Sequence, residues 1–257
     1  MDRLDADAIR AGLHTTAIGS QVVVFESIAS TNSVAAEYAI SPDHHGLAVF
    51  AEYQTAGRGR GKNRWISAKG DSLLGSIVLT RCSLRPELLS LTVAVATAEA
   101  IGLAARIKWP NDVLLSGKKV AGVLVESKAF DSHTAYVVGI GINCHQKAAD
   151  FPEVLLSKAT SIDLEAGTVV ERSMLARRLL TSLEGWLDMA GQDPGCAVDR
   201  WLQLSIQLGH RLTVVYGGGR FSGTCLGVDP QLGLILQLDC GGVRMFDAAQ
   251  SYIAKES

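Results

Sequence analysis

The connections between three apolar runs in the middle of the chain restrict the fold more than any other feature of the sequence. The runs are A-R-I-K-W (105–109), K-V-A-G-V-L-V-E-S (119–127) and A-Y-V-V-G-I-G-I-N (135–143). The first stretch between them contains P-N-D and S-G-K, which are turn-forming sequences. Connections this short cannot contain the crossover that parallel neighbours need. The sequence therefore predicts three strands that pair antiparallel, as a meander.

Other apolar runs, which lie before these three in the chain, predict further strands and one buried helix. The runs at 21–26, 46–53 and 73–79 are short and rich in Val, Leu, Ile or Phe, as buried strands are. The stretch 86–105 is different, because it is rich in Ala and Leu and is apolar for too long to be a strand. We expect a buried helix there.

Capping residues and apolar stripes predict three more helices. A short helix is expected within residues 30–39, capped by one of three polar residues, Ser30, Thr31 or Asn32. A leucine-rich stripe with a 3.6-residue period predicts a longer helix at about 169–190. Thr168 and Glu171 have the spacing of a capping box at its start. A helix at 197–204 is expected to close the large domain.

The texture of the sequence changes from Gly209 onward. Short β-branched runs alternate there with glycine-rich turns, which is typical of a small antiparallel barrel. We therefore expect an α+β fold, with a mixed but largely antiparallel sheet and packed helices in residues 1–206. A small β-barrel domain is expected in residues 207–257.

The overall composition excludes several classes of protein. The chain has 257 residues, with 24 basic and 26 acidic side chains and a net charge of -2, so it lacks the basic excess of a general nucleic-acid binder. No apolar run approaches the ~20 residues that span a membrane, and the N-terminus lacks a signal-peptide core. Five scattered cysteines without a C-x-x-C pair suit reduced thiols in the cytoplasm.

The loop sequence Q-T-A-G-R-G-R-G-K-N-R-W (54–65) concentrates positive charge in a slightly acidic chain. Its cations occupy every second position and no acid interrupts them: Arg58, Arg60, Lys62 and Arg64. Glycines expose backbone N–H groups, and arginine forks match phosphate or carboxylate oxygens. The spacing fits neither a P-loop nor a dinucleotide motif. An anion-binding loop and a plain solvated loop, or an RNA contact, are equally compatible with this stretch alone.

A second polar stretch, K-W-P-N-D (108–112), follows directly after a predicted strand. Its Lys108, Asn111 and Asp112 are turn formers or strand-end residues, but together they also supply what a nucleotide–magnesium site needs. Lysine neutralises phosphate, an amide can read adenine, and a carboxylate holds a hard cation. Lys119 precedes the next strand and could be merely solvated, or could face the same ligand.

Five stretches in this order resemble those of the biotin–protein ligases: S-T-N (30–32), 54–65, K-W-P-N-D (108–112), K-V-A-G-V-L-V-E (119–126) and G-I-G-I-N (139–143). The likeness is dense over 23–145 and weaker over 221–233. It implies a class II synthetase-like catalytic domain followed by an SH3-like barrel. Only about twenty residues precede the first predicted strand, so the resemblance implies a form without the N-terminal DNA-binding domain that some members carry.

The resemblance also implies a reaction. A member of this family activates biotin with ATP and Mg²⁺ to biotinyl-5′-AMP, then transfers biotin to a lysine of the biotin carboxyl carrier domain of acetyl-CoA carboxylase or a related carboxylase. The expected partners are small molecules and this carrier, with neither DNA nor a membrane. Two alternatives stay open: a lipoate–protein ligase, and a nucleic-acid- or peptide-binding module. We expect glycines to let the 54–65 loop fold over its ligand when the anions are present.

The resemblance assigns roles to particular residues. Those implied in biotin binding are Ser30, Thr31, Asn32, Gln54, Gly57, Arg58, Lys119 and Gly122. Those implied in ATP binding are Arg58, Arg60, Trp65, Lys108, Asn111 and Asn143. Asp112 is the implied Mg²⁺ ligand, and the catalytic cations are Lys119, Arg58, Arg60 and Lys108. Many bacterial members have a third arginine in the loop, and whether Arg64 replaces it here is left open.

Overall fold

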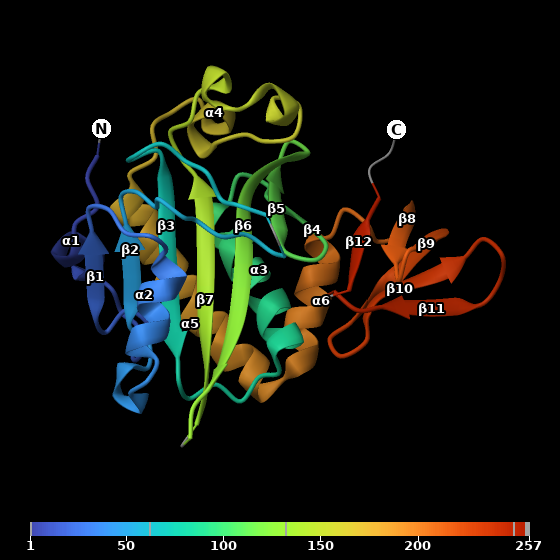
Figure 1. The fold of residues 1–257 in the computed structure, drawn as a ribbon, viewed down its shortest axis with the longest axis horizontal. Coiled ribbons are helices and arrows are strands. Elements are labelled where there is room, and N and C mark those ends of the chain that lie inside the picture. Colours follow the sequence, from blue (N-terminus) through green and yellow to red (C-terminus); the bar gives the residue numbers. More distant parts are fainter. Residues whose placement is uncertain (1, 62, 132, 249, 255–257) are drawn as a thin grey trace.

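The computed structural model of the protein describes residues 2–61, 63–131, 133–248 and 250–254. Lys62 of the basic loop therefore lies outside the described residues. The chain forms a large part, in which helices surround a seven-stranded sheet, and a smaller part that is a second, five-stranded sheet (Figure 1). In the part of the chain that the structure describes, no helix is long and apolar enough to cross a membrane.

The large sheet has the strand order β1-β2-β3-β7-β6-β5-β4. Its strands are β1 (Val22–Phe25), β2 (Ala48–Ala51), β3 (Ser72–Leu79), β4 (Arg106–Lys108), β5 (Asp112–Leu115), β6 (Lys118–Ala129) and β7 (Thr134–Asn143). Strands β1 and β2 pair in parallel, and every other neighbouring pair is antiparallel. The predicted meander is confirmed, with one strand more than expected. The sequence analysis did not separate β5 from the two turns beside it.

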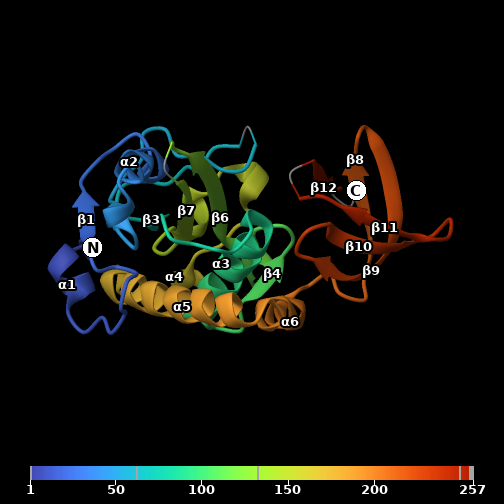
Figure 2. The ribbon, with the colours of Figure 1, turned by 90° about the horizontal axis from the view of Figure 1, so that it is seen from below.

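Helices cover both faces of this sheet. Helices α3 (Pro86–Ile101), α5 (Arg172–Gln192) and α6 (Pro194–Leu204) form one layer, and α2 (Thr31–Tyr38) lies on the opposite face (Figure 2). Neighbouring strand residues point to opposite layers: Ile77 packs in the core with α3 and α5, whereas Val78 packs in the core with α2. The remaining helical segments are α1 (Ala6–Arg10), α4 (Ile162–Ala166) and three short 3₁₀ turns, Pro42–His44, Ala148–Asp150 and Glu153–Leu155.

The buried helix predicted for 86–105 is confirmed, but it ends at Ile101. Proline stands at its first turn, and Gly102 ends it with a φ of 70° that disfavours other residues. The start of α5 differs from the prediction in its cap. Glu171 itself is the N-cap, because its carboxylate accepts hydrogen bonds from the N–H groups of Ser173 and Met174. The predicted capping box with Thr168 is therefore wrong.

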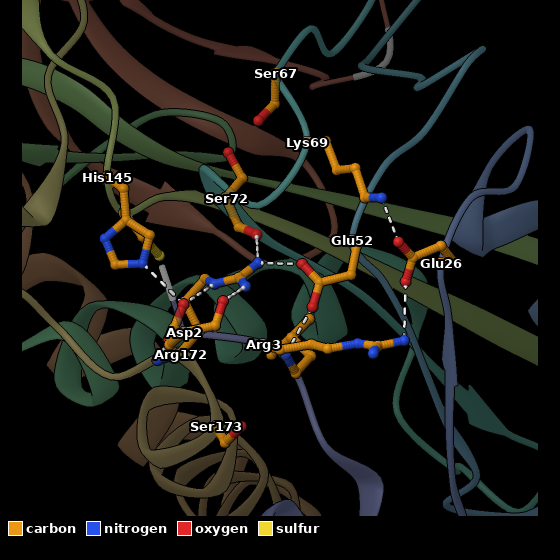
Figure 3. A network of polar contacts seen from close by, with 12 residues as sticks. Asp2, Arg3, Glu26, Glu52, Ser67, Lys69, Ser72, His145, Arg172 and Ser173 are labelled. Atoms are coloured by element: carbon orange, nitrogen blue, oxygen red, sulfur yellow. Dashed lines mark hydrogen bonds and ion pairs between the residues drawn. The ribbon is translucent and has the colours of Figure 1, made fainter.

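A fully buried arginine fastens the start of α5 to the rest of the large part (Figure 3). Arg172 Nε donates to Asp2 Oδ1 at 2.7 Å, and its NH1 group donates to Glu52 Oε2 at 2.8 Å and to the Ser72 carbonyl at 3.2 Å. His145 lies 3.1 Å from the same Asp2 oxygen. Burial alone would raise the pKa of Asp2, but hydrogen bonds from Arg172 outweigh it and hold that pKa below 3.8. This network joins the ends of β2 and β3 to α5.

The smaller sheet has the order β11-β10-β9-β8-β12 and is antiparallel throughout. Its strands are β8 (Arg211–Tyr216), β9 (Gly219–Asp229), β10 (Gly233–Leu238), β11 (Val243–Phe246) and β12 (Ser251–Ile253). The predicted antiparallel strands at the C-terminus are confirmed. Their closure as an SH3-like barrel and their division into a separate domain at residues 206–207 stay predictions. The segment between the two parts lies against β4, where Ile206 N–H donates to the Ile107 carbonyl at 3.0 Å.

Candidate active site

A cavity of about 630 Å³ lies where the basic loop, the start of α2, the middle of β6 and β7, the β4–β5 turn and strand β12 meet. It brings together twelve of the fourteen residues that the resemblance implied. These are Ser30, Thr31, Asn32, Gln54, Arg58, Arg60, Trp65, Lys108, Asn111, Asp112, Lys119 and Gly122. Gly57 and Asn143 lie outside the lining. Segments that are far apart in the sequence therefore share one cavity.

The basic loop is a small hairpin. Gly59 N–H donates to the Asn63 carbonyl at 2.9 Å, and Trp65 N–H donates to the Gly57 carbonyl at 3.1 Å. A Cβ on Gly57 would lie 2.5 Å from the Trp65 carbonyl oxygen, so glycine is required for the two arms to approach. Gly61 turns the chain with a φ of 66°. Gly57 thus shapes the hairpin instead of lining the cavity.

Each arginine of this hairpin is anchored to a different part of the protein. Arg58 donates to Glu126 Oε2 at 3.0 Å, Arg60 donates to the Ser251 carbonyl at 2.9 Å, and Arg64 donates to the Thr55 carbonyl at 3.3 Å. Burial lowers the pKa of Arg60, and the nearby carboxylates partly offset this effect. The closing of the loop over ligand anions stays a prediction. The structure shows that protein groups hold the loop through its three described arginines.

Polar side chains form a continuous hydrogen-bonded chain at one end of the cavity. Gln54 Oε1 accepts from the N–H of Thr31 at 2.6 Å and lies 3.1 Å from the Thr31 hydroxyl. The Ser76 hydroxyl lies 2.7 Å from that hydroxyl and 2.6 Å from Asn32 Oδ1. Asn32 Nδ2 donates to Glu126 Oε2 at 2.7 Å. Thr31, Asn32 and Gln54 therefore present neutral donors and acceptors in a fixed arrangement, and the charge of the neighbouring Arg58 is paired with Glu126.

Sequence analysis missed Ser76 and Glu126 as members of this chain. The one available signal for Ser76 was a hydroxyl inside an otherwise apolar strand, since a buried polar group needs a partner. Ser76 is fully buried. Glu126 closes the motif that begins at Lys119, but nothing in the motif names its partners, which lie 94 and 68 residues away.

The glycines of β7 make room for the side chains that shape the cavity. A Cβ on Gly139 would lie 2.1 Å from Asn32 Oδ1, and one on Gly141 would lie 2.7 Å from the Trp65 indole. Both glycines line the cavity and admit the neighbouring side chains. The buried Nε1 of Trp65 has no acceptor among the described residues.

Cationic and amide groups gather at the other end of the cavity. Lys119 Nζ lies 2.5 Å from Asp112 Oδ1 and 5.7 Å from the centre of the Trp65 ring. Asn111 Nδ2 donates to the Val123 carbonyl at 2.5 Å, which fixes the β4–β5 turn on β6. Lys108 also lines this end. The two ends of the cavity therefore differ in charge.

A residue of the connection between the two parts supports this turn. Gln207 is buried, and its Oε1 accepts a hydrogen bond from Trp109 N–H at 3.0 Å. The Trp109–Pro110 peptide bond is cis. Sequence analysis missed Gln207 because it lies 98 residues from its partner.

Asn143 lies at the end of β7, away from the cavity lining. Its Nδ2 donates to the Thr160 carbonyl at 3.0 Å, and its Oδ1 accepts from Gln146 Nε2 at 3.3 Å. Gln146 also donates to the Ser72 hydroxyl at 2.7 Å. These contacts connect β7 to β3 and to the segment before α4. The implied nucleotide contact of Asn143 stays a prediction.

The fit of the cavity to Mg²⁺ depends on Asp112. Among the described lining residues, it alone carries a carboxylate, and the described ranges contain no cluster of three or more His, Cys, Asp or Glu that could hold a metal. Mg²⁺ is usually held by one or two carboxylates together with substrate phosphates. Asp112 beside the cationic end fits that role.

The sequence and fold were compared with known proteins. Residues 24–143 match the model of the "Biotin/lipoate A/B protein ligase family". The chain is 32% identical to the bifunctional ligase/repressor BirA of Bacillus subtilis, over 96% of this chain and 78% of that protein.

Two further relatives extend this likeness. The biotin--[acetyl-CoA-carboxylase] ligase of Paracoccus denitrificans is 34% identical, over 83% of this chain and 94% of that protein. The structure of a mutant biotin protein ligase from Aquifex aeolicus, in complex with biotin, is 25% identical with a TM-score of 0.77, over 92% of this chain and 99% of that one. The chain belongs to the biotin–protein ligases of the biotin/lipoate A/B protein ligase family.

Proposed function

We propose that this protein activates biotin with ATP to form biotinyl-5′-AMP, and then transfers biotin to a lysine of a biotin carboxyl carrier domain. The observation that carries the proposal is the division of one cavity into a neutral, hydrogen-bonding end and a cationic end. A ligand with an uncharged ring and an anionic tail matches this division. The names of the similar ligases support the same reaction.

The neutral end suits the ureido ring of biotin. Thr31, Asn32 and Gln54 present hydroxyl and amide groups whose orientations are set by their mutual hydrogen bonds. A cyclic urea has both N–H donors and a carbonyl acceptor, so it can bond to such groups without burying a charge. Ser30 is buried beside them and completes this end.

The cationic end suits the two anions of the first step. The biotin carboxylate must approach the α-phosphate of ATP, and Lys119, Lys108 and Arg60 can offset the repulsion between them. Positive charge that is already in place stabilises the charge that develops on the phosphate oxygens. Neither step needs an enzyme nucleophile, and the lining residues that the structure describes include no cysteine or histidine.

The nucleotide is assigned to the region around the β4–β5 turn. Asn111 has a second N–H and an oxygen that can bond to adenine, and Trp65 offers an aromatic face. Asp112 together with the phosphates of ATP would hold Mg²⁺, which supplies charge neutralisation when bound. Asp112 also pairs with Lys119, so the residue that would hold the metal also positions the lysine that would meet the biotin carboxylate.

We place the reaction and its carrier in the cytoplasm. All five cysteines are free, and the buried thiol of Cys144 has its pKa raised to about 12 by burial, so it is unreactive. Free thiols of this kind suit a reducing compartment, where ATP is also present.

The test is incubation of the purified protein with biotin, Mg-ATP and a biotin carboxyl carrier domain, followed by the intact mass of the carrier. We expect one added biotinyl group on a single lysine, and none when ATP is omitted. A parallel incubation with lipoate and a lipoyl domain addresses the other branch of the matched family. Modification of the lipoyl domain alone would overturn the proposal.

A further inference from the structure

Glu126 lies beside the cavity and has no role in the proposed reaction. It lies on β6, and its side chain is 24% exposed. One carboxylate oxygen, Oε2, accepts hydrogen bonds both from Asn32 Nδ2 at 2.7 Å and from Arg58 at 3.0 Å. Both donors line the cavity, whereas Glu126 is outside the lining. A single carboxylate therefore holds two cavity residues that come from different elements.

The first of these residues, Asn32, has its amide orientation determined by Glu126. Asn32 Oδ1 faces the Ser76 hydroxyl at 2.6 Å, and Nδ2 faces Glu126. If the amide were reversed, Oδ1 would face the Glu126 carboxylate. These two groups repel each other, because both are hydrogen-bond acceptors. Gly139 allows the amide to lie here, since a Cβ at that position would be 2.1 Å from Oδ1. Glu126 thus sets the donor and acceptor positions that Asn32 offers.

The second residue, Arg58, connects the hairpin to the sheet through Glu126. Its guanidinium reaches from the first arm of the hairpin to β6. Arg60 and Arg64 hold other parts of the hairpin, at Ser251 and Thr55. Because Arg58 and Asn32 share the acceptor Glu126 Oε2, the bond to Glu126 holds Arg58 beside Asn32, at the neutral end.

We infer that Glu126 is a positioning residue that fixes the Asn32 amide and holds Arg58 over the end of the cavity that receives the uncharged ring of the substrate. This inference rests on the proposed function, because it takes biotin to be the occupant. Glu126 acts through Asn32 and Arg58, because it lies outside the cavity lining and bonds to these two residues at the neutral end. It therefore governs the affinity and residence time of biotin more than the nucleotide step.

The first experiment measures biotin binding calorimetrically without nucleotide, and the dissociation rate by stopped flow, for Glu126→Gln and Glu126→Asp. A charge-assisted pair at this exposure predicts about tenfold weaker binding and correspondingly faster dissociation for Glu126→Gln. Glu126→Asp keeps the charge and should recover part of the loss. In pyrophosphate exchange, the KM for biotin should rise more than kcat falls, and more than the KM for ATP rises.

Glu99→Gln is the matched control. Glu99 also accepts from an arginine and from a second N–H group, namely Arg200 Nε at 2.7 Å and Trp186 Nε1 at 2.8 Å. Its side chain is 33% exposed, close to that of Glu126, but it lies in the layer of α3, α5 and α6. We expect Glu99→Gln to bind biotin as the wild type does.

A double-mutant cycle with Arg58→Gln tests whether Glu126 acts through Arg58. We expect the double variant to lose less biotin-binding free energy than the two single variants lose together. Each single variant already breaks the same ion pair. Strict additivity would overturn the inference, as would wild-type biotin affinity in Glu126→Gln. If the wild-type protein itself fails to bind biotin, the proposed function fails instead, so the two failures are distinguishable.

Discussion

At the scale of single residues, the site depends on pairs of opposite charge at its edge. Lys119 pairs with Asp112, and Arg58 pairs with Glu126. All four side chains are partly exposed, with exposed fractions between 24% and 42%. Pairs at this exposure contribute little to the free energy of unfolding, but they set where each cation lies before the reaction. Substitutions at these positions should therefore change activity more than stability.

Lys119→Ala should abolish synthesis of the acyl-adenylate and leave the fold intact. A cation aimed at the developing charge is worth about 3 kcal/mol or more of the activation barrier, which is a loss of at least a hundredfold. Pyrophosphate exchange and urea unfolding measure the two effects. Lys118→Ala is the control, because the adjacent lysine does not line the cavity. Equal exchange rates in Lys119→Ala and the wild type would show that this lysine has no catalytic role.

Asn111→Ala should raise the KM for ATP more than the KM for biotin. The variant removes the proposed adenine contact, and it also removes the bond to the Val123 carbonyl that fixes the β4–β5 turn. Discrimination against GTP should weaken as well, because the amide's donor and acceptor match adenine. Steady-state kinetics with both nucleotides measure these changes. An effect confined to the KM for biotin would place Asn111 at the wrong end of the cavity.

At the scale of elements, glycines allow the hairpin arms and the side chains beside the sheet to pack closely. Gly57 allows the two arms of the hairpin to approach, and Gly139 and Gly141 allow Asn32 and Trp65 to pack on β7. Behind this surface, Arg172 joins α5 to β2 and β3 through a buried network. Strand β3, which contributes to the cavity lining, is therefore fastened by a charge cluster outside the site.

Arg172→Met should destabilise the protein by about 3–5 kcal/mol, because it leaves the buried carboxylate of Glu52 without its cation. The exposed Arg178 on the same helix offers the control, Arg178→Met, which should change stability little. Urea unfolding at pH 7 measures both. A loss as small as that of the control would contradict a stabilising role for the network.

The acid dependence of stability should change in the same variant. Since Arg172 holds the folded-state pKa of Asp2 below 3.8, folding favours the ionised carboxylate. This contribution is present above pH 3.8 and is lost as the pH falls through the lower folded-state pKa. The free energy of unfolding of the wild type should therefore fall more steeply than that of Arg172→Met on acidification. If the free energy of unfolding fell equally steeply with pH in both proteins, Arg172 would not stabilise the ionised carboxylate of Asp2.

At the scale of the whole molecule, the C-terminal part completes the cavity. Residues 250–253 belong to the lining, and the Ser251 carbonyl accepts the hydrogen bond from Arg60. Gln207, in the connection between the two parts, supports the turn that carries Lys108 and Asn111. The small sheet is thus a part of the site's wall, which gives the C-terminal domain a physical connection to the hairpin.

Arg60→Gly should separate the two half-reactions. The variant removes the anchor between the hairpin and β12 and places a third consecutive glycine in the loop, so closure over the adenylate costs more entropy. Some biotinyl-AMP should still form and escape to label bystander proteins. The measurement is biotin labelling of serum albumin with biotin and Mg-ATP but no carrier.

Arg64→Ala is the comparison for this prediction. It removes an equal charge from the same hairpin, but the described acceptor of Arg64 is Thr55, within its own loop. We expect Arg64→Ala to label albumin less than Arg60→Gly does. If Arg60→Gly makes the adenylate and labels no more albumin than the wild type, Arg60 does not retain the intermediate.

The sequence by itself determined the antiparallel meander, the buried helix, the C-terminal antiparallel strands and twelve of the residues that line the cavity. These features follow from short-range signals, namely the periodicity of apolar residues, turn-forming dipeptides and local motifs. The same local signals misplaced the cap of α5, because the carboxylate of Glu171 was available to the first turn and Thr168 was not needed. Local chemistry thus determines elements well and their ends less well.

Only the tertiary structure decided which polar groups meet. Ser76 bonds to residues 44 and 45 positions away, Gln207 to one 98 positions away, and Arg172 to Glu52, 120 positions away. No local pattern encodes such pairs, because each depends on how the strands stack and on which side chains the glycines admit. The anchors of Arg58 and Arg60 belong to the same class, since their acceptors lie on β6 and β12. The residue types therefore indicated the chemistry of the cavity, while packing determined the hydrogen-bond and ion-pair partners of each side chain.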